Sequence, residues 1–219
     1  MRGRPGTDIR LTIERDDHPP FDVTITRAII KIVAVRWRTE GNIGYLRVAT
    51  FSKATRDGVA KAMRDIRRSL GERMKGLVID LRDNPGGLLD ESVALADAFV
   101  ERGTLVSVRG RSVAAGHKYR ASAGDLAEGL PLVVLINGGS ASASEIVAVA
   151  LQDLKRATIM GGRSFGKGTV QTIMRLPTEG GLKMTTALYY SPLGRAIQAR
   201  GVVPDIAIDI GEGIKNPRR

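Results

Sequence analysis

The chain has 219 residues, of which 42% are hydrophobic and 26% charged, as in an ordinary globular protein. It contains no cysteine, which excludes disulfides, thiol catalysis and cysteine-ligated zinc, and no apolar run approaches the roughly 18 residues of a membrane span. The net charge of +11 comes from basic residues spread along the chain, and aromatic residues make up only 4%. A base-stacking surface is hard to build from so few rings, so we do not expect nucleic-acid binding.

The first 26 residues predict two strands. Residues 8–15 alternate apolar and polar side chains, and residues 21–26 do so again after a polar turn. Such alternation is typical of half-buried strands. Two strands are too few for a domain, so we interpret residues 1–26 as the last strands of a domain that begins outside this chain. Residues 1–6 show no apolar signal core, so any export signal is also expected outside the chain.

Residues 29 to 100 predict strands alternating with helices. Strands are expected at 29–35 and 43–48, and a helix at 56–70, where Val59, Met63, Ile66 and Leu70 recur at helical spacing. The apolar run at 76–81 predicts a strand buried on both faces. A turn at 83–87 and a helix at 88–100 follow.

The second half repeats this plan after a polar, glycine-containing stretch at 109–130. We expect a strand at 132–136, a turn rich in glycine and serine, a helix at 145–154, a strand at 158–160 and a further strand-like segment at 169–174. Buried strands that alternate with helices predict a layered α/β core.

The turn before the second-half helix is a candidate nucleophile site. Residues 139–144 read Gly-Ser-Ala-Ser-Ala-Ser. The N-terminus of a helix offers unpaired N–H groups, which a serine attack needs in order to stabilise the oxyanion. However, Ser142 and Glu145 also fit the capping box Ser-x-x-Glu. On this segment alone, a helix cap is the favoured interpretation.

Lys167 is a candidate base for such a serine, because the two histidines, His18 and His117, lie in no convincing catalytic setting. The loop around Lys167 is not a phosphate-binding loop, since Gly168 replaces the required hydroxyl and a strand-like segment follows. A lysine base must be largely neutral, which requires burial without a carboxylate partner. Gln171 would share a face with Lys167 on an extended segment and could orient the amine. The alternatives are a solvated loop lysine and an edge polar residue.

Two further features remain open. Ser164 stands three residues before Lys167 and is a second candidate nucleophile, although the glycines around the lysine make the required helix improbable. The turn at 83–87 ends in Gly86 and Gly87, whose backbone N–H groups could approach a substrate closely; otherwise it is an ordinary turn. Two isolated histidines and scattered acids give no metal-ligand spacing, so we expect neither metal nor cofactor.

Taken together, the segments 80–87, 137–146, 165–171, 189–198 and 201–205 resemble the carboxy-terminal processing (tail-specific) serine proteases. The resemblance extends from about residue 27 to 210. It implies that Ser142 is the nucleophile, Lys167 the base and Gln171 the partner of the lysine. It also implies an oxyanion hole made by the backbone N–H groups of Ala143 and of Gly86 or Gly87.

The same resemblance implies a domain organisation and a substrate class. Residues 27–210 would form the catalytic core, a crotonase-like α/β core with a cap region. Residues 1–26 would be the C-terminal remnant of a PDZ domain, and residues 211–219 a basic tail. Expected substrates are proteins with apolar, unstructured C-termini, cleaved in the periplasm or bacterial cell envelope. A homo-oligomer and an adaptor or regulatory protein are further partners to consider.

Two other functions remain as alternatives. The chain could be a latent fragment that binds polypeptide without cutting it, because a truncated PDZ domain puts alignment of the catalytic residues in doubt. A crotonase-type acyl-CoA enzyme would share the implied fold, but the pairing of serine with lysine gives no reason to expect coenzyme A.

Overall fold

The computed structural model describes residues 1–29, 33–111, 116–177 and 180–208, and it divides into two compact units, Met1–Val33 and Ala34–Arg219. The first unit is an antiparallel hairpin of β1 (Asp8–Arg15) and β2 (His18–Thr26). Arg10 pairs with Asp22 across it. Both strands predicted here are confirmed, with β2 starting three residues earlier than expected.

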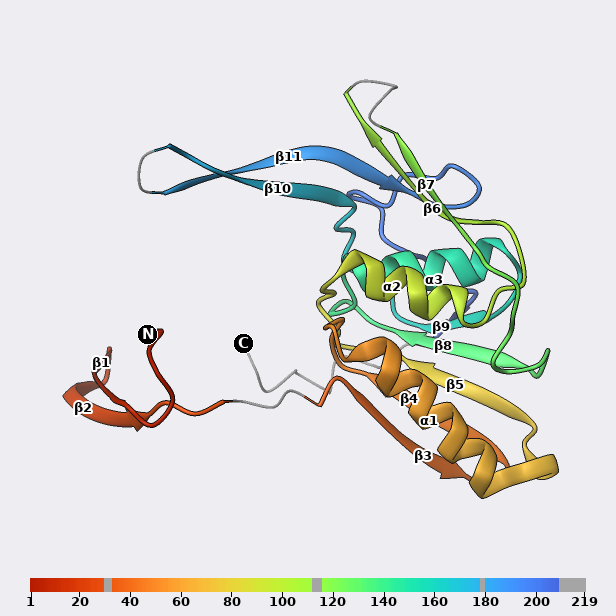
Figure 1. Ribbon diagram of the computed structural model, residues 1–219, viewed down its shortest axis with the longest axis horizontal. Coiled ribbons are helices and arrows are strands. Elements are labelled where there is room, and N and C mark those ends of the chain that lie inside the picture. Colours follow the sequence, from red (N-terminus) through yellow and green to blue (C-terminus); the bar gives the residue numbers. More distant parts are fainter. Residues whose placement is uncertain (30–32, 112–115, 178–179, 209–219) are drawn as a thin grey trace. The chain divides into compact units, whose positions relative to one another are not determined.

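The second unit contains a six-stranded sheet (Figure 1). In spatial order the strands are β12 (Ile206–Ala207), β9 (Thr158–Gly161), β8 (Leu132–Ile136), β5 (Gly76–Asp80), β4 (Ile43–Val48) and β3 (Val35–Glu40). All neighbours are parallel except β3 and β4. Parallel strands require crossover connections, which the helices provide.

One predicted strand is placed wrongly. We expected a strand at 29–35, but β3 starts only at Val35. The register pairs Val35 with Val48, the last residue of β4, so earlier residues have no ladder partner in that strand. Residues 30–32 lie outside the described part of the chain.

Three helices accompany this sheet: α1 (Thr55–Leu70), α2 (Leu89–Asp97) and α3 (Ala143–Asp153). Helix α1 contacts β3 and β4, α3 contacts β9, and α2 packs against both other helices. The apolar face predicted for α1 is buried, and Gly71 ends the helix with φ 53°, before the 3₁₀ turn η1 (Gly71–Arg73). Every residue of α3 is buried. Residues 146–151 are all small or apolar, as expected for a helix inside a core. The buried polar residues at its two ends are hydrogen-bonded, as burial requires: Ser144, Glu145, Gln152 and Asp153.

A second, antiparallel sheet consists of β10 (Thr169–Arg175), β11 (Gly181–Tyr190), β6 (Thr104–Gly110) and β7 (His117–Arg120), in that spatial order. Helices α2 and α3 contact β6 of this sheet (Figure 1). The sequence predicted β10 but none of the other three strands. The β10–β11 ribbon carries exposed apolar side chains, including Ile173 and Met184.

The parallel arrangement brings four connections to one edge of the six-stranded sheet. The carboxyl ends of β4, β5, β8 and β9 all point the same way, so the segments 49–54, 81–88, 137–142 and 162–168 follow that edge. In open parallel sheets this edge is the usual place for a binding site.

Within the described residues, no helix is both long and apolar enough to span a bilayer.

Candidate active site

The turn after β5 and the turn after β8 are in direct contact. Ala141 donates its N–H to the carbonyl of Asn84 (3.0 Å), and the Ser144 hydroxyl donates to the same carbonyl (2.9 Å). A Cβ on Gly86 would lie 3.0 Å from the Cβ of Ser142 and 3.0 Å from the nitrogen of Ala143. Only glycine permits this approach, so the predicted oxyanion turn and the serine run meet at one place.

Ser142 differs from the other two serines of its run. Ser140 and Ser144 are fully buried, and their hydroxyls donate to the carbonyls of Leu81 and Asn84. Ser142 is half-buried and adopts φ 56° and ψ −111°, a left-handed backbone conformation that costs a non-glycine residue energy. Such strain persists where the surroundings impose it, which is common at functional sites.

The capping box predicted for Ser142 and Glu145 is present at the start of α3. The N–H of Ser142 donates to Oε2 of Glu145 at 2.8 Å. The helix-cap interpretation is therefore correct for the local structure. It leaves the nucleophile hypothesis open, because the box explains the helix start and not the strained backbone of Ser142.

Two glycines of the β5 turn hold different roles. The N–H of Gly86 donates to Oδ1 of Asn84 at 2.9 Å, so it is already bonded. No acceptor for the N–H of Gly87 occurs among the hydrogen bonds of the described residues. The N–H of Ala143 is the first of α3, where helical amides have no partner within the helix. Among these bonds of the described residues, the N–H groups of Ala143, next to Ser142, and of Gly87, next to Gly86, therefore have no acceptor.

Lys167 lies in the connection between β9 and β10, and its backbone N–H donates to Oε2 of Glu145 at 2.8 Å. Its side chain is exposed, so the burial that we expected for a lysine base is wrong for this structure. The flanking residues Gly166 and Gly168 have no side chains with which to cover it. Among the described residues it forms neither an ion pair nor a hydrogen bond with the Ser142 hydroxyl.

Gln171 lies on β10, opposite Thr185 of β11, next to a register irregularity between Val170 and Gln171. Its side chain is exposed, and it has no hydrogen bond to Lys167 within the described part of the chain. The structure thus brings Ser142 and Ala143 into contact with Gly86, and Gly87 is the next residue of the same turn. The backbone of Lys167 is linked to the backbone of Ser142 through the Glu145 carboxylate. Among the described residues, Gln171 has no hydrogen bond to Lys167.

Ser164 does not fit the role of a second nucleophile. It is buried, its hydroxyl donates to Oε1 of Glu145 at 2.5 Å, and it accepts the N–H of Val202 at 2.7 Å. Residues 164–168 form no helix, so the Ser-x-x-Lys spacing does not place Ser164 and Lys167 one helical turn apart.

The described residues contain no group of acids and histidines arranged to hold a metal ion.

Sequence reasoning missed a buried ionic cluster beside the β5 turn. Asp80 accepts hydrogen bonds from the side chains of Arg82, Arg47 and Tyr45. Burial alone would raise the pKa of the Asp80 carboxyl, but the hydrogen bonds from Arg82 and Tyr45 outweigh it and lower this pKa to about 2. Asp80 also accepts the backbone N–H of Arg82, which fixes the chain as it enters the glycine turn.

Residues 42–208 match the model of peptidase family S41. The chain belongs to this family. A carboxy-terminal-processing protease of Bartonella bacilliformis is 52% identical over 211 residues, which are 95% of this chain and 49% of that protein. A Staphylococcus aureus protein named "Probable CtpA-like serine protease" is 35% identical over 214 residues, 95% of this chain and 42% of that protein.

The solved structure of a photosystem II D1 C-terminal processing protease has a TM-score of 0.74 and 32% identity, over 94% of this chain and 56% of that one. The chain therefore spans about half the length of the relatives that it matches. The resemblance to carboxy-terminal processing proteases, which we drew from the sequence motifs, is confirmed.

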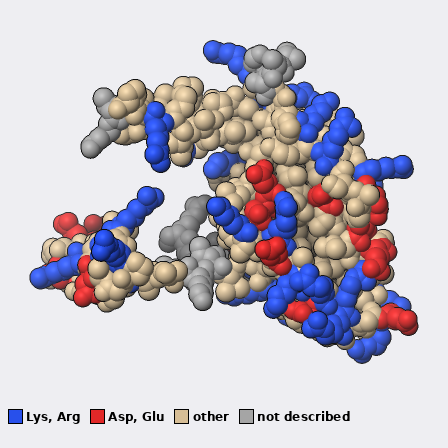
Figure 2. Space-filling view, viewed as in Figure 1, with Lys and Arg blue, Asp and Glu red and all other residues tan. Residues whose placement is uncertain are grey.

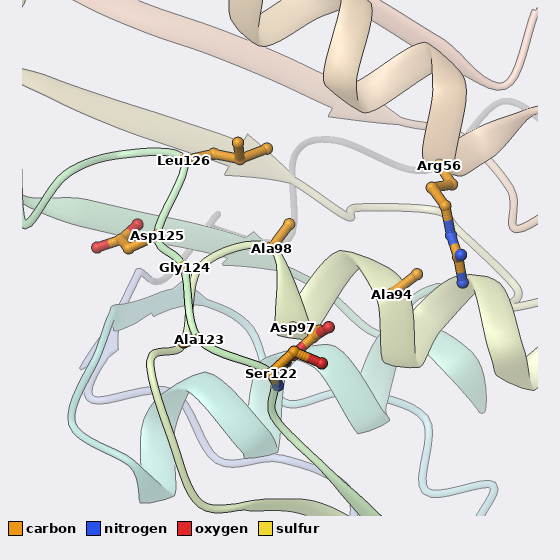
Figure 3. A pocket seen from close by; sticks show the side chains of 9 residues that line it. All are labelled: Arg56, Ala94, Asp97, Ala98, Ser122, Ala123, Gly124, Asp125 and Leu126. Carbon is orange, nitrogen blue, oxygen red and sulfur yellow. Dashed lines mark hydrogen bonds between the residues drawn. The ribbon is translucent and has the colours of Figure 1, made fainter.

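Other features of this S41 chain lie apart from the serine turn. A cavity of about 390 Å³ is lined by Arg56 of α1, Asp97 of α2 and the segment 122–126 (Figure 3). The Ser122 N–H donates to Asp97 there at 2.6 Å, and none of the predicted site residues lines the cavity.

On the face shown in Figure 2, the described Lys and Arg side chains lie among Asp and Glu over much of the surface.

Proposed function

We propose that the chain is the catalytic core of a serine endopeptidase, with Ser142 as nucleophile, Lys167 as general base and Gln171 as the residue that orients the lysine amine. One observation carries the proposal. Ser142 is the half-buried, left-handed serine of its run, it packs against Gly86, and one oxygen of Glu145 accepts both its N–H and that of Lys167.

The chemistry follows from these positions. The Ser142 hydroxyl attacks a peptide carbonyl while Lys167, in its neutral form, takes the hydroxyl proton. Collapse of the tetrahedral intermediate breaks the C–N bond, and the lysine gives the proton to the leaving amine. Water then attacks the ester while the lysine accepts a proton from it. The C–O bond to Ser142 breaks, the lysine returns that proton to the serine oxygen, and the acid product leaves.

The oxyanion is stabilised by the two free donors, the N–H groups of Ala143 and Gly87. Gly86 is the less suitable of the two predicted glycines, because its N–H is bonded to Asn84. Its role is to let the turn approach Ser142. The requirement for a neutral Lys167 is met when a bound polypeptide covers the exposed amine and removes it from water.

The finer assignments rest on the family resemblance. The proposed substrates are proteins with apolar, unstructured C-termini, and the name of the Bartonella relative, a carboxy-terminal-processing protease, supports C-terminal processing. We assign residues 27–210 to a crotonase-like core with a cap, residues 1–26 to a PDZ remnant and residues 211–219 to a basic tail. The full-length protein would act in the periplasm or cell envelope, as a homo-oligomer or with an adaptor or regulatory protein.

A second candidate, a latent polypeptide-binding module, rests on one observation. The Lys167 side chain is exposed and makes no hydrogen bond to the Ser142 hydroxyl within the described chain. In this alternative, the chain binds unfolded polypeptide and does not cut it.

Mass spectrometry of an unfolded protein with an apolar C-terminus, incubated with each variant, separates the two functions. We expect Ser142→Ala to lower kcat/KM by about 1,000-fold or more and Lys167→Ala by about 100-fold or more. Ser69→Ala and Lys75→Ala, both at exposed positions of the second unit, are matched controls. Cleavage that Ser142→Ala leaves unchanged would contradict the proposal, and binding without cleavage by wild type would support the latent module.

A further inference from the structure

Glu145 joins the serine turn to the lysine loop. It is completely buried in the first turn of α3, and its carboxylate accepts four hydrogen bonds. Oε1 accepts the Ser164 hydroxyl (2.5 Å) and the Gly166 N–H (2.7 Å). Oε2 accepts the N–H groups of Ser142 and Lys167, both at 2.8 Å. A buried carboxylate is tolerated when its oxygens are bonded in this way.

Helix capping does not account for this arrangement. Of the four bonds to the Glu145 carboxylate, the capping box uses only the one from the N–H of Ser142. The other three donors come from Ser164, Gly166 and Lys167, which lie 19 to 22 residues further along the chain. Glu145 therefore binds a second segment of chain whose position α3 does not otherwise require.

We propose that Glu145 is a positioning residue, which sets the distance between the nucleophile and its base. This inference rests on the proposed function, since it matters for catalysis only if Ser142 and Lys167 carry the chemistry. Because one oxygen accepts both N–H groups at 2.8 Å, the two backbone nitrogens lie at most 5.6 Å apart. The exposed lysine side chain thus starts from a fixed point beside the serine.

The chemistry of the four bonds explains why a carboxylate is needed. All four partners are donors, and a carboxylate has two acceptor oxygens. Glutamine has the same shape but one oxygen only. Its NH₂ group would face two donors, either the pair from Ser164 and Gly166 or the pair from Ser142 and Lys167. In the first case the Ser164 hydroxyl can turn to accept from the NH₂ group, so the Gly166 bond is lost; in the second case both bonds are lost.

The test compares Glu145→Gln with Asp125→Asn in the 219-residue chain. Asp125 is a matched control, because its carboxylate accepts the N–H groups of Ala127 and Gly129 and pairs with Arg156, outside the serine and lysine segments. We expect Glu145→Gln to lower kcat by about 100-fold with KM little changed, since misplacing reacting groups by about 1 Å costs this much. Asp125→Asn should leave kcat and KM unchanged.

Amide hydrogen exchange provides a readout that needs no activity. In wild type, the amides of Ser142, Gly166 and Lys167 should exchange slowly, although the Lys167 side chain is exposed. In Glu145→Gln, either the Gly166 amide or the Ser142 and Lys167 amides should exchange faster, while the core of α3 keeps its protection. A purely structural role would instead lower protection throughout α3 and lower the melting temperature, without a selective loss in kcat.

The outcomes separate the two proposals. If Ser142→Ala cleaves as wild type does, the proposed function fails, and exchange still decides the role of Glu145. Fast exchange of Gly166 and Lys167 in wild type would overturn the inference, as would a folded Glu145→Gln with unchanged exchange and kcat. If Glu145→Gln does not fold, the wild-type exchange and Glu145→Asp, which keeps the charge on a shorter side chain, give the same decision.

Discussion

The serine turn and the lysine loop lie at the same edge of the sheet but are built differently. Around Ser142, the residues Asn84, Ser140 and Ser144 are fully buried and bonded to backbone groups. Lys167 and Gln171, in contrast, have exposed side chains. The proposed oxyanion donors are thus held in place by the fold, as electrostatic stabilisation requires, while the proposed base is held by its backbone and its side chain is exposed.

This difference predicts how stability and activity respond to substitutions in each half of the candidate site. The buried half should respond to substitution by losing both stability and activity, because its bonds maintain the turn. The exposed half should respond in activity alone, since few packing contacts depend on it. The predictions below test this division, from the largest expected effect to the smallest.

Gly87→Ala should give the largest combined effect. A Cβ at this position would lie 2.1 Å from the carbonyl oxygen of Phe51, and the backbone has φ 145°. We expect unfolding free energy to fall by about 3 kcal/mol and kcat/KM to fall by about 100-fold, because an oxyanion donor is displaced. Chemical denaturation and the cleavage assay measure both quantities.

Gly138→Ala is the matched control for Gly87→Ala. A Cβ on Gly138 meets nothing within 4 Å, so this variant should resemble wild type in stability and activity. If Gly87→Ala also resembled wild type, the turn would tolerate displacement, and the buried half of the site would not be fixed as we describe.

The free energy of unfolding at acid pH should depend on the ionisation of Asp80. Its folded pKa is about 2 against an ordinary value of 3.8, so the ionised form stabilises the fold above about pH 4. This contribution, about 2 kcal/mol, is lost as the pH falls from 3.8 through 2. We expect the stability difference between wild type and Asp80→Asn, measured by urea unfolding, to shrink over that range. A difference independent of pH would contradict the assignment.

Gln171→Ala should have the smallest effect. Because Gln171 is exposed and is not bonded to Lys167 in the described chain, it can only orient the amine once substrate is bound. We expect kcat to fall by less than about tenfold and the free energy of unfolding to stay unchanged. The neighbouring Thr172→Ala, also exposed, is the control. A loss as large as that of Lys167→Ala would give Gln171 a direct part in the proton transfer.

The sequence predicted the central sheet better than the second one. The bounds of β4 and β8 agree with the expected strands at 43–48 and 132–136, because short apolar runs between turn residues are typical of buried strands. Strands β6, β7 and β11 were missed. β7 lies inside the polar stretch at 109–130, and β11 is mostly exposed, so neither has the apolar pattern that marks a buried strand.

The candidate site shows the same limit. The serine run, the glycine turn and Lys167 could be found from residue type and spacing, but the bonds that join them could not. The sequence around Glu145 indicated only a helix cap, since its bonds to Ser164, Gly166 and Lys167 depend on how distant segments fold together. The burial of Lys167 was predicted wrongly because the chemical requirement for a neutral base does not say which residues cover it.

The most direct test of the Ser142–Lys167 pair is covalent labelling of the 219-residue chain with a serine-directed fluorophosphonate, followed by peptide mapping and mass spectrometry. The account predicts a single adduct on Ser142, whose rate of formation falls by about 100-fold or more in Lys167→Ala and is unchanged in Lys75→Ala. An adduct on Ser164, or labelling of Ser142 at the same rate without Lys167, would contradict it.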